Sequence, residues 1–99
     1  MQTYVIYWEF GNSENHNAAA KAFVDLLESG GQKDIFDGFQ LVIRVINPQG
    51  FNGWAIVKSS DHKAIWKWTN PWVKDFGANF VVTPVLTDEE YLEASNSED

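Results

Sequence analysis

The segment FQLVIRVINPQGFNGWAIVKS, residues 39–59, decides the fold because it contains two strand-like runs joined by a short connection. Phe39 to Ile46 and Gly53 to Ser59 are rich in β-branched and aromatic residues, as strands are. Between them, Asn47-Pro48-Gln49-Gly50 ends the first run, since proline lacks a ladder donor and asparagine and glycine favour turns. The segment therefore predicts an antiparallel hairpin.

Upstream of the hairpin, the sequence predicts one strand and one helix. Thr3 to Phe10 is a second β-branched and aromatic run, closed by the turn residues Gly11 to Ser13. Glu14 to Ser29 is predicted as a helix that ends at Gly30-Gly31, and the polar residues Gln32 to Gly38 connect it to the hairpin. Its apolar residues recur at the spacing of one helical stripe: Ala19, Phe23, Leu26 and Leu27.

Downstream of the hairpin, a second helix is predicted between a cap at Ser60 or Asp61 and an end at Gly77. Because proline disfavours a helical residue before it, we expect a kink or a fresh start at Pro71, with Asn70 as the cap. The apolar residues again share one face: Ile65, Trp68, Trp72 and Phe76.

The chain closes with one more strand and an acidic end. Asn79 to Leu86 is the strand, and Pro84 predicts that it is an edge or bulged strand. Thr87 and Glu90 have the spacing of a capping box, so a short helical turn should follow. The order βαββαβ predicts an α+β fold, a ferredoxin-like sandwich with an antiparallel sheet over residues 1–87, with residues 88–99 as an acidic helical turn and tail.

Composition limits what the protein does. The 99 residues include no Cys, which excludes disulfides and thiolate chemistry, and no apolar run is long enough to cross a membrane. The N-terminus lacks the pattern of a signal peptide, so we expect a soluble cytoplasmic protein. The net charge of -7 argues against binding to nucleic acid or to membrane surfaces, although six of the 14 acids lie in the last twelve residues.

Strand alternation predicts two apolar sheet faces. The face under the helices is expected to carry Tyr4, Ile6, Trp8, Leu41, Ile43, Val45, Trp54, Ile56, Phe80 and Val82. The opposite face is expected to carry Val5, Tyr7, Glu9, Gln40, Val42, Arg44, Ala55, Val57, Val81, Thr83 and Val85. The second set is too apolar to stay in water, which predicts a homodimer through this sheet face. The alternative cover is the C-terminal segment, folded back across the face.

The second half of the chain also carries a family resemblance. It combines a strand at Gly53 to Val57, a helix holding Trp66, Trp72 and Asp75-Phe76, and a closing strand from Phe80 through Thr83 to Thr87. This pattern resembles a domain-of-unknown-function family of small proteins from bacteria, including cyanobacteria, and their phages. The resemblance implies a dimeric α+β barrel, in which two ferredoxin-like sheets pack face to face, and it implies no established activity.

Two polar residues on the less apolar face are the first candidates for a site. Glu9 and Arg44 are placed in the middle of neighbouring strands, where they form a cross-strand ion pair that fixes the dimer register. Alternatively, they bind a small polar ligand inside the barrel, with hydrogen bonds from Tyr7, Gln40 and Thr83.

A second set of candidates would line a pocket between the second helix and the sheet: Trp8, Trp54, His62, Trp66, Asn70 and Trp72. In cofactor-free monooxygenases of the same fold class, such side chains hold a polycyclic substrate for attack by oxygen. The alternative is a tryptophan-rich core, because aromatic residues dominate burial in small domains. His16 and His62 have no metal-ligand spacing, so no metal and no cofactor is expected.

Gly53-Trp54-Ala55-Ile56-Val57 is faintly similar to the third-strand signature of RNA-recognition motifs, but Asn52 and Ile56 replace the basic and second aromatic residues. Binding of single-stranded nucleic acid is therefore a minor alternative. The main hypothesis is a small homodimer that binds a small ligand or a partner protein in a regulatory role. The second is a cofactor-free oxygenase or isomerase for an apolar aromatic substrate, which requires a cavity of ~300 Å³ or more.

Overall fold

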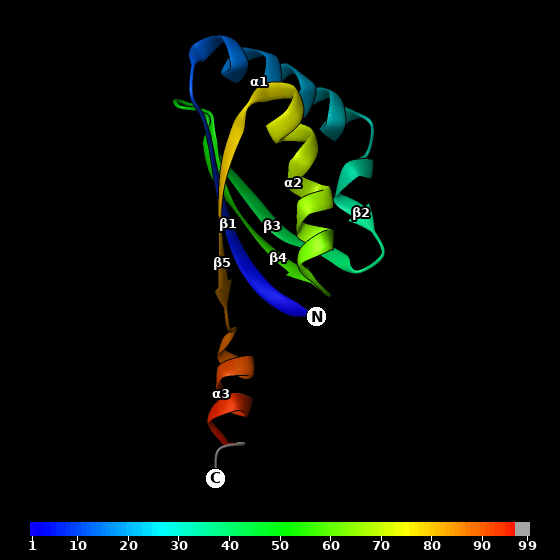
Figure 1. Ribbon diagram of the computed structural model, residues 1–99, viewed down its shortest axis with the longest axis vertical. Coiled ribbons are helices and arrows are strands. Elements are labelled where there is room, and N and C mark those ends of the chain that lie inside the picture. The colour runs from blue at the N-terminus through cyan, green and yellow to red at the C-terminus, as the bar shows by residue number, and fades with distance from the viewer. Residues whose placement is uncertain (97–99) are drawn as a thin grey trace.

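The computed structural model describes residues 1–96, in which the chain forms a five-stranded antiparallel sheet and three α-helices (Figure 1). The elements are β1 (Gln2–Phe10), α1 (Ser13–Glu28), a 3₁₀ turn η1 (Gln32–Asp34), β2 (Ile35–Phe36), β3 (Phe39–Asn47), β4 (Asn52–Ser59), α2 (His62–Phe76), β5 (Ala78–Val85) and α3 (Asp88–Asn96). The predicted α+β class is confirmed.

The strands follow the order β2-β3-β4-β1-β5, and every neighbouring pair is antiparallel. The predicted hairpin is present as β3 and β4, closed by the pair Asn47 and Asn52. β5 lies at an edge of the sheet, and its outer side pairs with none of the other four strands. The missing amide hydrogen of Pro84 therefore removes no hydrogen bond on that side. The segment predicted as a polar connector contains η1 and β2, which are too short to show a sequence period.

Side-chain caps begin both long helices. The carboxylate of Asp61 accepts a 2.9 Å hydrogen bond from the amide of Ala64, and Gly77 ends α2 in the left-handed conformation. The predicted fresh start at Pro71 is wrong, because α2 runs without a break through this residue. Burial of Trp68 and Thr69 against the body holds the helical path through the proline.

The helices α1 and α2 lie on the same side of the sheet (Figure 1). Six of the ten residues predicted for this face lie there: Tyr4, Ile6, Trp8, Leu41, Phe80 and Val82. The prediction is wrong for Ile43, Val45, Trp54 and Ile56, which lie on the opposite, open face, and for Arg44, Ala55 and Val57, which lie under the helices.

Two local features reverse the predicted faces. In β3, a register shift between Leu41 and Ile43 adds a residue, so the alternation inverts after Val42. In β4, Gly53 is the residue that faces Trp8, and this places Trp54 on the other side. The β4 register therefore follows the space that the Trp8 ring requires.

The core between helices and sheet has two parts. One is centred on β1, β4 and α2, with Ile6, Val57 and Trp68. The other joins α1 to the β3–β4 turn through Phe23 and Phe51. In contrast, no residue of α3 is buried, and this helix extends from the end of β5 along the 53 Å long axis of the molecule (Figure 1).

Candidate functional site

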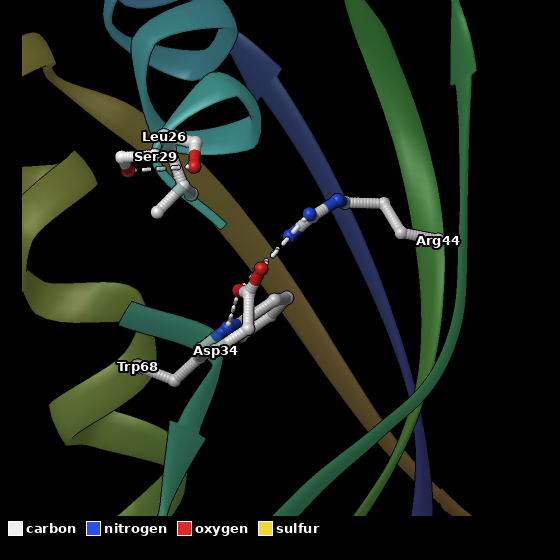
Figure 2. A network of polar contacts seen from close by, with 5 residues as sticks. All are labelled: Leu26, Ser29, Asp34, Arg44 and Trp68. Carbon is white, nitrogen blue, oxygen red and sulfur yellow. Dashed lines mark hydrogen bonds and ion pairs between the residues drawn. The ribbon is translucent and has the colours of Figure 1, made fainter. Parts of the chain in front are cut away.

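Arg44 lies between the sheet and the helices, because the β3 bulge turns its side chain toward α1. Its guanidinium makes a two-pronged contact with Asp34, in which Nη1 donates to Oδ1 and Nη2 donates to Oδ2, both at 3.0 Å (Figure 2). The two side chains are 11% and 10% exposed. The pair is therefore a largely buried ion pair, and its two parallel hydrogen bonds are the geometry in which a guanidinium binds a carboxylate most strongly.

The carboxylate of Asp34 has a third donor. The indole Nε1 of Trp68, on α2, donates a 2.7 Å hydrogen bond to Oδ1 (Figure 2). Asp34 thus connects the 3₁₀ turn η1 to both the sheet and α2. Because a buried charge is costly unless it is paired and hydrogen-bonded, these three donors are what makes the carboxylate tolerable there.

Aromatic rings surround the ion pair. The guanidinium of Arg44 lies 4.6 Å from the centroid of the Phe23 ring, a cation–π distance. Beside it is a cavity of about 30 Å³ lined by Arg44 and seven aromatic residues: Trp8, Phe10, Phe23, Phe51, Trp68, Trp72 and Phe80. By volume this space is close to two water molecules. It is far below what a polycyclic substrate needs.

The predicted site residues divide into three groups. Trp8, Arg44 and Trp72 line the cavity. Tyr7, Glu9, Gln40, Trp54 and Thr83 lie on the open face of the sheet. His62 and Trp66 are exposed on α2, and Asn70 is half-buried in the middle of the same helix. The single pocket predicted for the tryptophans, His62 and Asn70 is therefore not assembled in this structure.

The predicted ion pair between Glu9 and Arg44 is wrong. β4 separates β1 from β3, and the two side chains lie on opposite faces of the sheet. Glu9 instead accepts a 3.1 Å hydrogen bond from the hydroxyl of Tyr7, which itself accepts one from the amide of Asn52 at 3.2 Å. These polar groups form one border of the open face.

The centre of the open face is apolar. Tyr7 and Trp54 lie side by side with ring centroids 5.5 Å apart. Around them are exposed aliphatic side chains from three strands: Val42, Ile43, Val45, Ile56 and Val81. We refer to these seven residues as the open-face patch.

Sequence reasoning missed Asp34, and it placed Trp68 in the core without a polar role. No local motif marks Asp34, which lies in a segment predicted as a connector. The available signal is chemical: an arginine turned toward the helices needs a buried carboxylate, and Asp34 and Asp37 are the acids of the segment just before β3.

Across residues 1–96, no group of three or more His, Asp or Glu side chains is arranged to hold a metal ion. In the same range, no helix has the length and apolar character needed to span a bilayer.

Comparison with known proteins identifies the family. The model for a domain of unknown function (DUF3303) matches residues 2–98, nearly the whole chain. No curated protein and no solved structure matches the chain. The predicted resemblance to a family of unknown function is thus confirmed.

Proposed function

The chain belongs to the DUF3303 family, whose function is not assigned, and we propose that it acts as a homodimer formed by the open-face patches of two copies. In this arrangement two ferredoxin-like sheets pack face to face as a dimeric α+β barrel. The order β3-β4-β1-β5, with α1 and α2 on one side, supports that assignment, and β2 is an addition at the edge of the sheet.

The observation that carries the proposal is the exposure of large apolar side chains in the middle of the sheet. Ile43 is 52% exposed, Trp54 is 44% exposed and Val81 is 59% exposed. With their neighbours they form an apolar area on the order of several hundred Å², comparable to the largest patches found on monomers and often functional. An antiparallel sheet that faces water normally carries polar residues there.

The C-terminal segment, as far as Asn96, leaves this patch open. α3 has no buried residue and extends away from the end of β5 (Figure 1). It is tied to the sheet by a 2.8 Å hydrogen bond from the hydroxyl of Thr3 to Glu90, at the far end of β1 from Glu9. A second copy is therefore the simplest cover for the patch.

The border of the patch also fits an interface. Interfaces combine an apolar centre with a polar rim. Here the chain of hydrogen bonds through Asn47, Asn52, Tyr7 and Glu9 follows one end of the apolar centre. A two-fold axis, which is the commonest symmetry of homo-oligomers, would bring the same patch of both copies together.

Single-stranded nucleic acid is the competing occupant, because half-buried Tyr7 and exposed Trp54 offer rings for base stacking. The electrostatics favour the dimer. Among the residues of β1, β3, β4 and β5 that face outward, the positive charge of Lys58 is balanced by the negative charge of Glu9. A backbone of phosphates needs a more positive surface.

The test is the oligomeric state of two variants, measured by light scattering after size exclusion. Wild type should have twice the mass of the 11.3 kDa chain. Val45→Asp, in the patch, should be a monomer with unchanged circular dichroism. Trp66→Lys, a change at an exposed residue on the helix side, should remain a dimer. A monomeric wild type, or a Val45→Asp dimer, would refute the proposal.

A further inference from the structure

The Arg44 guanidinium is occupied by a side chain of the same protein, held on the segment between α1 and β3. We propose that Arg44 anchors a binding site for a small monocarboxylate with an apolar or aromatic body, and that Asp34 fills the carboxylate position until such a ligand displaces it. This site lies on the helix side of the sheet, so it does not depend on the dimer.

The chemistry of the cavity matches that ligand. Arg44 is the charged residue of a wall that is otherwise aromatic. A guanidinium fork binds any carboxylate with the two parallel hydrogen bonds now made to Asp34. Trp68 Nε1 supplies the third donor at the same position. A ligand carboxylate that replaced Asp34 would thus find three donors already in place.

The segment that carries Asp34 has glycine turns at both ends, where it could pivot. Residues 30–38 begin and end with glycines in the left-handed region: Gly30 at φ 96°, Gly31 at φ 69° and Gly38 at φ 80°. Between them, β2 pairs with β3 at two positions, and Ile35 is 73% exposed. Release of this segment breaks the three hydrogen bonds of Asp34, the two β2–β3 pairs and the packing of Phe36, and it leaves the ladder of β3, β4, β1 and β5 intact.

A groove next to the segment gives the ligand a place to enter. It has a volume of about 510 Å³ and is lined by Asp34 and its neighbours, including Phe36, Phe39 and Leu41. The rings of Phe36 and Phe39 stack at 4.8 Å. Asp34 lies in the wall of this groove and also binds Arg44 and Trp68, which line the aromatic cavity. Displacement of Asp34 would therefore join the groove to the cavity.

Charge selects a monoanion. Asp37 and Asp34 both line the groove, so a dianion such as a phosphate monoester would meet two acids and one guanidinium. A monocarboxylate brings the same charge as the side chain it replaces. The apolar body of the ligand would contact the aromatic rings of the cavity. The site should therefore prefer an aromatic carboxylate to a short polar one.

Benzoate is a suitable probe, and its neutral analogue benzamide is the matched control ligand. Asp34→Asn removes the competing charge at constant size and should bind benzoate at least ~10-fold more tightly than wild type, because the internal carboxylate no longer competes. Asp88→Asn makes the same change at an exposed residue of α3 that lines neither the groove nor the cavity, and it should leave the affinity unchanged. Binding is measured by calorimetry at constant ionic strength.

Two variants of the anchor complete the design. Arg44→Met should abolish binding, and Arg44→Lys should weaken it by roughly 10-fold, since lysine keeps the charge but lacks the fork. If Asp34→Asn does not fold, the wild-type indole Nε1–H resonance of Trp68 remains a readout and should shift with benzoate but not with benzamide. No shift at 100-fold excess over protein, or equal binding of benzamide, would overturn the proposal, whatever the oligomeric state.

Discussion

The indole ring of Trp8 lies so close to Gly53 on the neighbouring strand that a Cβ at position 53 would come within 2.6 Å of the ring. The two residues are paired across β1 and β4. The absence of a side chain at Gly53 therefore leaves the space that the buried Trp8 ring occupies beside the aromatic cavity.

Gly53→Ala should lower the free energy of unfolding by about 1–3 kcal/mol, the usual cost of overpacking a core. The added methyl meets the Trp8 ring and the carbonyl of Val45, and the backbone cannot give way. Urea unfolding followed by tryptophan fluorescence measures this change. Gly11→Ala is the control, because nothing lies within 4 Å of a Cβ there. Equal stability of the two variants would contradict the packing seen around Trp8.

Removal of one partner of the buried ion pair should be strongly destabilising. Arg44→Met leaves the Asp34 carboxylate without two of its three donors, and we expect a loss of about 3–5 kcal/mol. The double variant Asp34→Asn/Arg44→Met should recover part of that loss, because no buried charge is left unpaired. Thermal and urea unfolding of wild type, the two single variants and the double variant complete a double-mutant cycle. Strictly additive losses would show that the two side chains are not coupled.

The stability of α3 should depend on pH through Glu90. Hydrogen bonds from the amide of Thr87 and the hydroxyl of Thr3 lower the pKa of this carboxyl below its ordinary value of 4.5. Because the pKa of Glu90 is lower in the folded state, ionised Glu90 stabilises α3 fully at pH values above its unfolded-state pKa. This stabilisation is lost as the pH falls through the folded-state pKa.

Helicity of α3 should therefore decrease as the pH falls below 4.5. Amide exchange or NMR shifts of residues 88–96 measure this. Glu90→Gln keeps the capping box but has no charge to lose, so its α3 should show a flatter response in the same range. The same pH dependence in both proteins would place the responsible group elsewhere.

Truncation after Thr87 should leave the fold intact and lower the solubility. The removed residues carry six of the 14 acids and no base, so the remaining chain has 8 acids and 7 bases, a net charge of -1 instead of -7. No residue of α3 is buried, and the body loses one hydrogen bond at Thr3. Circular dichroism and ammonium sulfate precipitation test both parts. An unfolded truncated chain would show that α3 supports the sheet.

Local sequence patterns were sufficient for most of the architecture. The hairpin, the caps at Asp61 and Gly77, the capping box of Thr87 and Glu90 and the edge position of β5 all follow from propensity and turn chemistry. These features depend on residues close together in the chain. The two-residue strand β2 was missed, because a strand of this length leaves no pattern in the local sequence.

The candidate site could be predicted only in part. Trp8, Arg44 and Trp72 were candidates and do line the cavity, but they were assigned to different faces or pockets. Alternation within β3 gave the wrong side for Arg44, since a single extra residue at the bulge inverts every position after it. Asp34 was out of reach, because its role depends on an arginine ten residues away and on a tryptophan 34 residues away.

By itself, the sequence determined which segments form the long helices and the four long strands, the antiparallel pairing of β3 with β4, and an acidic C-terminal end, because backbone propensity, capping and charge are local properties. Only the tertiary structure decided which face of the sheet each side chain occupies, that Arg44 binds Asp34 rather than Glu9, and that Trp54 and Ile56 lie outside the core. The physical reason is packing: the bulge in β3 and the space needed by the Trp8 ring set the register, and both arise from contacts between segments distant in the chain.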